Sequence, residues 1–299
     1  MPSVIWRFSD GKPGHDSQSN GLIDALSRRL AVQRFELHTV AGWRAGAWWL
    51  GRRFPPGARL PAPSLLIGAG HATHLPMLAA RRRYGGRSVV LMKPSLPCAC
   101  FDLCLVPQHD AAGPADNVLV TQGVLNGVRG SDRHDPDTGL VVLGGPSRHV
   151  RWDDDNMVRQ VHDLLRRRPR GRWRLTGSRR TPAALVERLQ RELPWLEVLP
   201  YTQTPAGWLA ARLAEAGEVW VSRDSVSMIY EALSSGARVG LLDVPARRRS
   251  RVARGIDTLI ARGWVSAPGR TAPTGGPARP LDEAARCADW IVQQWLSGN

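Results

Sequence analysis

Residues 218–242, EVWVSRDSVSMIYEALSSGARVGLL, contain three consecutive elements with almost no chain between them. Residues 218–222 are a short apolar run, which is typical of a buried strand. Four apolar side chains then recur at the spacing of one helix face: Val226, Ile229, Tyr230 and Leu233. Gly236 stands where a glycine commonly ends a helix, and residues 239–242 form a second apolar run. Strand–helix–strand units build parallel sheets, so the chain is predicted to be α/β.

The turn between this strand and helix is rich in polar side chains. Asp224, Ser225 and Ser227 surround the helix start. Ser and Asp commonly cap helices, because their oxygens accept hydrogen bonds from free backbone N–H groups. Free N–H groups and hydroxyls at a helix start also make phosphate sites. Glu231, on the second turn, fits a surface carboxylate and a ribose-binding carboxylate equally well, and the spacing alone leaves both open.

The pattern R-x7-E-x4-G at Arg223, Glu231 and Gly236 resembles the donor-site helix of the GT-B glycosyltransferases. The similarity is greatest to the type that adds N-acetylglucosamine to the peptidoglycan lipid. In that family the glutamate binds the ribose of the nucleotide sugar, and the helix start faces the diphosphate. The resemblance implies donor binding by five residues: Asp224, Ser225, Ser227, Met228 and Glu231.

Stretches spread over most of the chain resemble the Elm-type mitochondrial fission family, whose bacterial members resemble glycosyltransferases. The stretches lie between about residues 6 and 242: DGKPGHDSQ, LIGAGHAT, FDLCLVPQHD, NVLVTQGVLNGV, VLGGPSRH, LTGSRRTP and SRDSVSMIYEAL. The resemblance implies a GT-B-like α/β fold, with two doubly wound Rossmann-like domains facing a cleft. The family name records a plant phenotype and not a reaction.

The first predicted strand, residues 4–8, runs into residues 9–18, where two glycines and a proline predict a loop. Such a loop lies at the carboxyl edge of a parallel sheet, where α/β proteins bind ligands. His15 is the best general-base candidate, since histidine can take a hydroxyl proton near neutral pH. The alternative is an ordinary connection with a capping side chain. Five more residues here are predicted to bind the acceptor: Asp10, Gly11, Lys12, Gly14 and Gln18.

This loop also resembles the glycine-rich acceptor loop of the GT-B lipid transferases, which ends in histidine, although this chain has GKPGH in place of a run of glycines. Two other strand ends carry polar side chains at the same predicted edge. A second glycine turn contains His71, and the strand at residues 103–106 is followed by His109 and Asp110. Asp110 is an alternative base. The two histidines are predicted to bind the acceptor, with a structural role as the alternative.

Residues 130–139 read as a linker, which predicts an acceptor-binding domain at 1–132 and a nucleotide-sugar-binding domain at 133–280. The Pro/Gly-rich part of the second domain, residues 267–280, is predicted to be mobile. The last helix, in residues 281–299, is expected to return and pack on the first domain, as it commonly does in this architecture.

Two turns of the second domain have a composition suited to phosphate. Glycine lets backbone N–H groups approach a phosphate closely, because it has no Cβ, and the first turn contains Gly144, Gly145 and Ser147. The next turn contains Ser178, Arg179 and Arg180. Arginine can bind a diphosphate bidentately. The alternative is that these are two more arginines of an arginine-rich chain.

The chain has 299 residues and a formal net charge of +15. Strong positive charge is typical of nucleic-acid-binding proteins. Lysine occurs only at positions 12 and 93, however, the arginines are scattered, and no RNA- or DNA-binding motif accompanies them. No specific nucleic acid is therefore expected. Anionic lipid head groups or a phosphorylated glycolipid fit the charge as well.

Residues 42–53 are apolar with basic ends. They suit either a helix that packs in the core or the acceptor groove, which we prefer, or a surface helix that enters a membrane interface. No apolar run reaches about 18 residues, so no membrane-spanning helix is expected, and the first residues do not resemble a signal peptide. The predicted location is the cytoplasm, with peripheral contact at the inner face of an anionic membrane.

No metal and no cofactor are expected. Cys98, Cys100 and Cys104 have no fourth ligand nearby, and Cys100 and Cys104, which flank an apolar strand, read as small buried hydrophobes. Residues 153–155, three aspartates, lie at a predicted helix start and read as capping charge.

The pattern as a whole predicts a metal-independent glycosyltransferase. The donor is a nucleotide sugar, and the acceptor is a cell-envelope glycan or glycolipid such as lipopolysaccharide core. The alternatives are a non-catalytic GT-B-like adaptor, which the family's plant name suggests, and a nucleotide-sugar epimerase, which the same donor pocket would serve.

Overall fold

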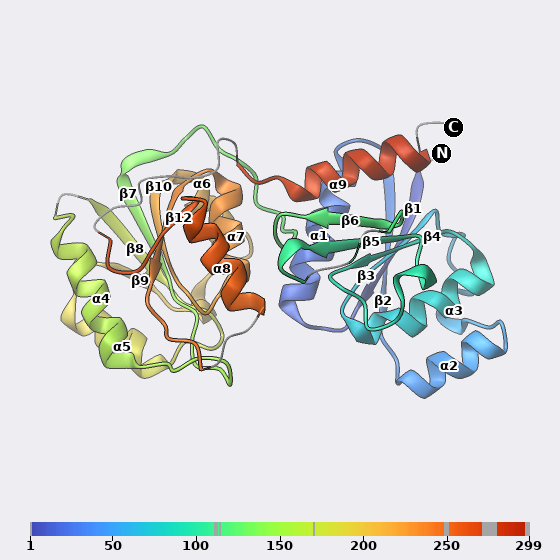
Figure 1. Cartoon of the computed structure of the whole chain (residues 1–299), viewed down its shortest axis with the longest axis horizontal. Helices are drawn as coiled ribbons and strands as arrows, with labels where there is room; N and C mark the ends of the chain where they lie inside the picture. The colour runs from blue at the N-terminus through green and yellow to red at the C-terminus, as the bar shows by residue number, and fades with distance from the viewer. Residues whose placement is uncertain are drawn as a thin grey trace. The chain divides into compact units, whose positions relative to one another are not determined.

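The computed structural model describes residues 2–110, 113, 115–169, 171–247, 251–270 and 280–296. Two compact units are present: one extends to Gly127 and resumes at Asp282, and the other spans Val128–Leu281. Each contains one six-stranded sheet whose strand pairs are all parallel (Figure 1). Most of the predicted mobile segment, residues 271–279, lies outside the described residues.

The sheet of the first unit has the strand order β2-β1-β3-β4-β5-β6. Its strands are β1 (Ser3–Ser9), β2 (Val32–His38), β3 (Leu65–Ala69), β4 (Arg87–Leu91), β5 (Leu103–Pro107) and β6 (Val118–Thr121). Its helices are α1 (Pro13–Ser27), α2 (Gly42–Leu50), α3 (His74–Tyr84) and α9 (Glu283–Ile291), the last continued by a π-helical turn, η6 (Val292–Leu296). Short 3-10 turns are η1 (Pro55–Gly57), η2 (His71–Thr73), η3 (Cys98–Cys100) and η4 (Gln108–Asp110).

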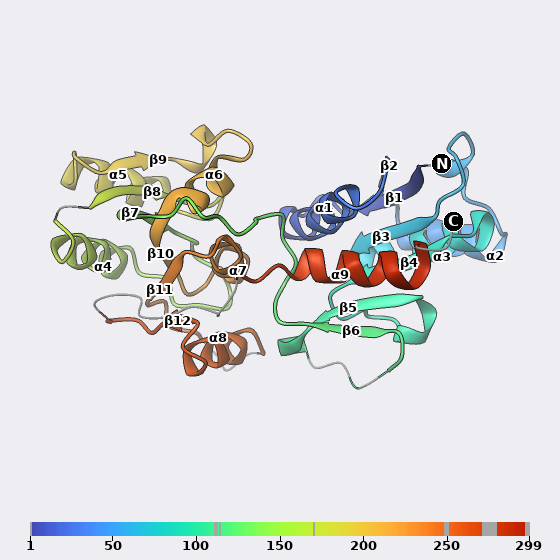
Figure 2. The same ribbon diagram turned by 90° about the horizontal axis from the view of Figure 1, so that it is seen from above.

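This sheet has a separate hydrophobic core on each face. On one face α1 and the returning α9 lie side by side (Figure 2), and they bury Leu22, Leu26 and Ile291 against the strands. On the other face Trp6 and Phe8, both from β1, are the largest fully buried side chains, and Met77 of α3 packs in the same cluster. Burying apolar area on both faces explains why the strands are almost uniformly apolar.

The sheet of the second unit has the order β12-β11-β10-β7-β8-β9. Its strands are β7 (Asp135–Val142), β8 (Arg172–Thr176), β9 (Glu197–Leu199), β10 (Ala216–Ser222), β11 (Arg238–Leu242) and β12 (Val265–Ser266). Its helices are α4 (Asp154–Arg166), α5 (Ala183–Glu192), α6 (Trp208–Glu215), α7 (Val226–Ser235) and α8 (Arg251–Ala261), with one 3-10 turn, η5 (Tyr201–Gln203). Helices α4 and α5 cover one face, and α6 and α7 cover the other (Figure 1). The predicted α/β fold of two doubly wound Rossmann-like units is confirmed.

Three local predictions about element limits differ from the structure. The predicted loop at residues 9–18 is shorter, because α1 begins at Pro13, whose fixed φ suits the first helical position. The predicted linker at 130–139 is partly strand, since β7 begins at Asp135. The second unit begins before the predicted division at residue 132. Ser131 already belongs to it, because its N–H donates to Ser235 O at 3.0 Å and its hydroxyl to Ala214 O at 2.8 Å.

Both sheets reverse their strand order at one point. In the first unit the reversal lies between β1 and β3, and in the second between β7 and β10. The loops that follow these strands diverge to opposite faces and leave a crevice, where doubly wound proteins bind ligands. The topology therefore predicts a ligand site at residues 10–12 and 70–73 in one unit, and at 143–147 and 223–225 in the other.

His74, at the start of α3, makes the stability of the first unit depend on pH. It is buried against Phe101, and burial, followed by the nearby His71, lowers its pKa to about 4. Between pH 6.5 and 4 the unfolded chain binds a proton there and the folded chain does not. The free energy of unfolding therefore decreases as the pH is lowered. We expect a loss of about 3 kcal/mol between pH 7 and 4 in urea unfolding.

Urea unfolding over the same pH range also distinguishes the contribution of His74 from that of other titratable groups. His74→Gln is expected to flatten the slope between pH 7 and 4, whereas His38→Gln, at an exposed strand end, should leave it unchanged. An equal slope in the parent and His74→Gln would contradict this assignment.

Candidate functional site

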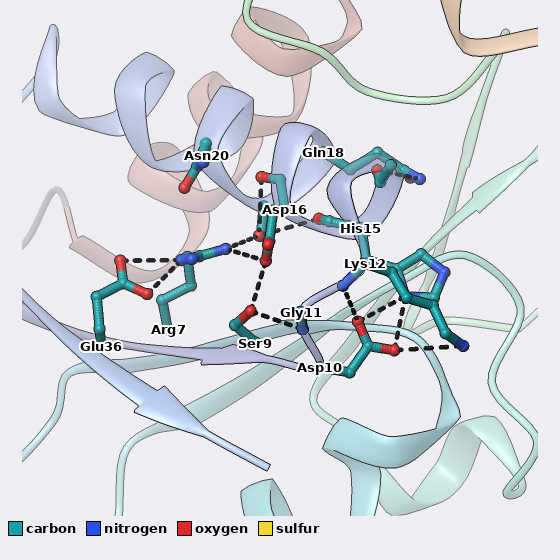
Figure 3. Close-up of polar contacts among 12 residues, drawn as sticks. Arg7, Ser9, Asp10, Gly11, Lys12, His15, Asp16, Gln18, Asn20 and Glu36 are labelled. Carbon is teal, nitrogen blue, oxygen red and sulfur yellow. Dashed lines mark hydrogen bonds and ion pairs between the residues drawn. The ribbon is translucent and has the colours of Figure 1, made fainter. Parts of the chain in front are cut away.

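The site in the first unit is centred on a carboxylate–imidazole pair. Asp10 begins the loop after β1, and its carboxylate is almost completely buried. His15 lies on the first turn of α1, with Nδ1 at 2.9 and 3.0 Å from the two carboxylate oxygens of Asp10 (Figure 3). The carboxylate can only accept, so in the neutral ring Nδ1 carries the proton and Nε2 has the free lone pair. That tautomer is the one a general base requires.

Two backbone features hold this pair in place. Asp10 also accepts the N–H of Lys12 at 3.2 Å, which fixes its carboxylate at the start of α1. Gly70, after β3, has φ +89°, and a Cβ there would collide with the His15 ring and lie 3.0 Å from Asp10 Oδ2. Only glycine fits this close approach without strain. The β1 and β3 loops therefore meet at the pair, as the sheet topology predicts.

A buried arginine of β1 fixes the first turn of α1 through an ion pair. Arg7, on β1, is 2.7 Å from both Asp16 Oδ1 and Glu36 Oε2 (Figure 3). Ser9 donates to Asp16 at 2.7 Å and accepts the N–H of Gly11 at 3.1 Å. Burial raises the pKa of Asp16, but the hydrogen bonds from Ser9 and Arg7 and the Arg7 charge outweigh burial and bring the pKa below 3.8. Its contribution to stability is thus present above pH 3.8 and is lost as the pH falls through the folded pKa.

The other residues predicted to bind an acceptor are placed differently. Lys12 is exposed, with Nζ 3.6 Å from Asp10, and Gly14 is exposed on the same turn. Gln18 is buried, and its amide donates to Gly14 O at 3.2 Å and lies 3.5 Å from Met92 Sδ. A buried side chain with these partners positions α1, so Gln18 does not fit the predicted contact with an acceptor.

His71, His109 and Asp110 all lie at the carboxyl edge of this sheet. His71 is exposed and directly follows Gly70. His109 and Asp110 lie in η4 after β5, which is three strand positions from β1. Three strand spacings amount to about 14 Å. Of the two predicted bases, His15 is therefore the one for which the structure provides an orienting carboxylate.

The site in the second unit is centred on another buried carboxylate. Asp224 follows β10, and its side chain is wholly buried beside the turn after β7. It accepts hydrogen bonds from Gly145 N at 3.0 Å, from Ser222 Oγ at 2.7 Å and from Arg180 Nη2 at 2.8 Å. Gly144 N–H donates to Ser222 Oγ at 2.6 Å. This network joins the turns after β7, β8 and β10.

These contacts correct the role expected of the glycine turn. The N–H groups of Gly144 and Gly145 are directed to Ser222 and Asp224, and a Cβ at either glycine would collide with Asp224 or with the backbone of Arg180. The two glycines thus allow close packing and do not present free N–H groups to a phosphate. Ser178 likewise donates to Gly144 O at 2.9 Å and belongs to the turn.

A cavity of about 380 Å³ opens beside this network. Its polar lining comes from Ser147, His149, Arg180, Arg223 and Asp224, and its apolar lining from Val150, Val244, Ala246, Ala253 and Ile256. A mostly apolar cavity with a few convergent polar groups is typical of ligand pockets. Sequence reasoning missed the apolar wall, because the loop after β11 and helix α8 carry no motif. Arg179 is exposed and is not among the residues that line it.

Helix α7 begins at this cavity. Ser225 is its buried N-cap residue, and the side chain of Ser225 makes no capping hydrogen bond. The first N–H groups of a helix bind anions well when they have no other partner. Ser227 is exposed, while Met228 and Glu231 are half-buried. Ser227 and Glu231 are four residues apart and so lie on one helix face, one turn apart.

Two further predictions concern groups outside these sites. Asp153 caps α4 by accepting the N–H groups of Asp155 and Asn156, so the capping role is confirmed. Cys104 is buried, and burial raises the pKa of its thiol strongly, which fits an inert core residue. Cys100 is only half-buried, although it packs against the core as a small hydrophobe. Within the described residues no group of three His, Cys, Asp or Glu side chains could hold a metal ion.

Two Rossmann-like units, each with polar groups at the switch point of a parallel sheet, define the GT-B class of fold. MurG from Acinetobacter baumannii has this fold, with a TM-score of 0.60 at 11% identity, covering 98% of this chain and 100% of that one. UDP-GlcNAc 2-epimerase from Neisseria meningitidis, bound to UDP-GlcNAc, has a TM-score of 0.56 at 11% identity, with both chains fully covered. The chain belongs to the mitochondrial fission ELM1 family, whose model matches residues 13–295. No curated protein matches its sequence.

Proposed function

We propose that this chain transfers a sugar from a nucleotide-sugar donor to a hydroxyl of a cell-envelope glycan or glycolipid, such as lipopolysaccharide core. The Asp10–His15 pair carries this proposal, because its geometry leaves an oriented imidazole nitrogen free to take a proton. A GT-B fold whose two switch points both carry polar groups supplies the rest of the argument.

On the acceptor side, His15 Nε2 removes the proton of the attacking hydroxyl. Asp10 holds the ring in the required tautomer and stabilises the imidazolium that forms. In this proposal four further groups contact the acceptor around this base: Gly11, Lys12, Gly14 and the exposed His71. Asp110 and His109, farther along the sheet edge, would contact a larger acceptor.

On the donor side, the cavity of the second unit holds the nucleotide. The start of α7, with Ser225, Ser227 and Met228, faces the phosphates, and Arg180 and Arg223 neutralise the negative charge that grows on the leaving group. Ser147 and Arg179 border the same turns. Glu231, one turn along α7 from Ser227, accepts the ribose hydroxyls. Protein groups thus provide the positive charge, so the transfer needs no metal ion.

Two other functions share this fold. A non-catalytic adaptor would keep the fold without turnover. An epimerase would use the donor cavity alone, and UDP-GlcNAc 2-epimerases are structurally as similar as MurG, with TM-scores of 0.58 and 0.56 against 0.60.

NMR of the reaction products separates the three functions. The chain is incubated with UDP-, GDP-, dTDP- and CMP-sugars, with and without extracted envelope glycolipid. A transferase releases free nucleotide only when the acceptor is present. New sugar resonances without nucleotide release would indicate the epimerase, and no change in any mixture would indicate the adaptor. Either of these two outcomes would overturn the proposal.

A further inference from the structure

Helix α2 has two apolar sides, and only one of them is packed. Ala45 is fully buried, and Trp48 packs edge-to-face on Phe54 at 5.6 Å between ring centroids. On the opposite side Trp43 and Leu50 are 76% and 73% exposed. Core packing, the preferred prediction for this helix, is therefore found on one of its sides and not on the other.

The exposed apolar residues of α2 form one stripe. Trp43, Ala47 and Leu50 recur at i, i+4 and i+7 and therefore share a helix face. A Cβ at Gly46, between them, would meet no atom within 4 Å, so none of the described residues packs closely over this position. Trp49, at the edge of the stripe, is 39% exposed. We name Trp43, Ala47, Trp49 and Leu50 the α2 stripe.

The chain around the α2 stripe is rich in basic residues, and α3, which packs against α2, carries Arg81, Arg82 and Arg83, of which Arg81 pairs with Asp102. Residues 37–101 contain no aspartate or glutamate, but they contain Arg44, Arg52, Arg53, Arg59, Arg81, Arg82, Arg83, Arg87 and Lys93. Two of these arginines lie directly over indole rings: Arg82 over Trp49 at 4.6 Å and Arg44 over Trp48 at 5.7 Å. The partner of this surface must therefore be both apolar and anionic.

We infer that the α2 stripe docks the first unit onto the surface of an anionic lipid bilayer. Tryptophan favours the lipid–water interface, where its ring is apolar and its N–H remains hydrated. Each arginine near an anionic surface adds electrostatic attraction. The nine residues of α2 are too few to cross a bilayer, so the helix lies in the interface plane. In the described residues no helix is long and apolar enough to cross a membrane.

Vesicle co-sedimentation tests this inference without reference to any activity. The full chain should bind vesicles of phosphatidylglycerol and phosphatidylcholine, and bind pure phosphatidylcholine about tenfold or more weakly, because about a fivefold factor is expected for each basic residue at the surface. Trp43→Ser with Leu50→Ser, both exposed, should lower binding at least tenfold. Trp195→Ser, at a tryptophan of the second unit that is 59% exposed, is the matched control and should bind like the parent.

A second matched pair of variants tests the contribution of positive charge to vesicle binding. Arg44→Gln with Arg53→Gln should weaken binding about tenfold or more, whereas Arg166→Gln with Arg191→Gln in the second unit should have little effect. Equal binding to neutral and anionic vesicles, parent-like binding by the Trp43→Ser/Leu50→Ser variant, or no binding at all would overturn the inference. The inference would also be overturned if light scattering showed that the parent self-associates and the Trp43→Ser/Leu50→Ser variant does not, because the partner of the α2 stripe would then be a second copy of the chain.

Discussion

Replacing His15 by glutamine is expected to lower the rate of sugar transfer by a factor of about 10²–10⁴, the usual contribution of a positioned base. Asp10→Asn should cause a loss of similar size. Asparagine presents its NH₂ group to Nδ1, which moves the ring proton to Nε2 and removes the free lone pair. The ring is partly exposed, so the fold should persist.

Initial rates with the donor and acceptor identified by NMR check this prediction. His38→Gln is the matched control, because His38 is an exposed histidine at the end of the neighbouring strand β2. Near-parent rates in both His15→Gln and Asp10→Asn would show that this pair is not the base.

Asp224→Ala is expected to lower the free energy of unfolding by about 3 kcal/mol, which corresponds to roughly 6–12 °C in Tm. The substitution leaves Gly145 N–H, the Ser222 hydroxyl and Arg180 without their shared acceptor in a buried location. Buried donors without a partner are costly. Because Arg180 remains partly exposed, water compensates some of this loss, and the expected value is therefore at the lower end of the range for buried pairs.

Asp257→Ala is the matched control for this prediction. Asp257 also pairs with an arginine of the cavity, Arg223, but it is well exposed. Exposed ion pairs contribute little to stability, so Asp257→Ala should unfold within error of the parent in urea. Equal effects of the two variants would mean that the Asp224 network does not hold the three turns together.

The sequence predicts the fold because the two signals that define its elements, apolar runs for strands and helical spacing of apolar residues, are both local. Apolar runs that alternate with helical spacing define each strand and helix, and Gly236 ends α7 with φ +90°, as its position predicts. The limits of α1 and β7 are less well predicted, because Pro13 starts a helix as readily as it extends a loop, and residues 135–139 have the composition of a linker.

The sites are predicted less completely because they depend on distant contacts. His15 and Asp224 stand out by residue type and position, but the sequence does not show that Asp10 orients His15 or that Asp224 occupies the glycine N–H groups. Arg7 is the one charge within an otherwise apolar strand, which is a usable signal. The apolar wall of the cavity has no such signal, since it forms only when α8 packs beside the sheet.

Thermal unfolding with a panel of UDP, GDP, dTDP, CDP and CMP is the most direct test of the claim that the second unit binds a nucleotide. It is measured on the parent, on Glu231→Ala and on Glu187→Ala, which removes an exposed glutamate of α5. We expect one nucleotide, at 100 times its dissociation constant, to stabilise the parent and Glu187→Ala by about 2.7 kcal/mol and Glu231→Ala by much less. Stabilisation by none of the five, or equal stabilisation of all three proteins, would contradict the claim.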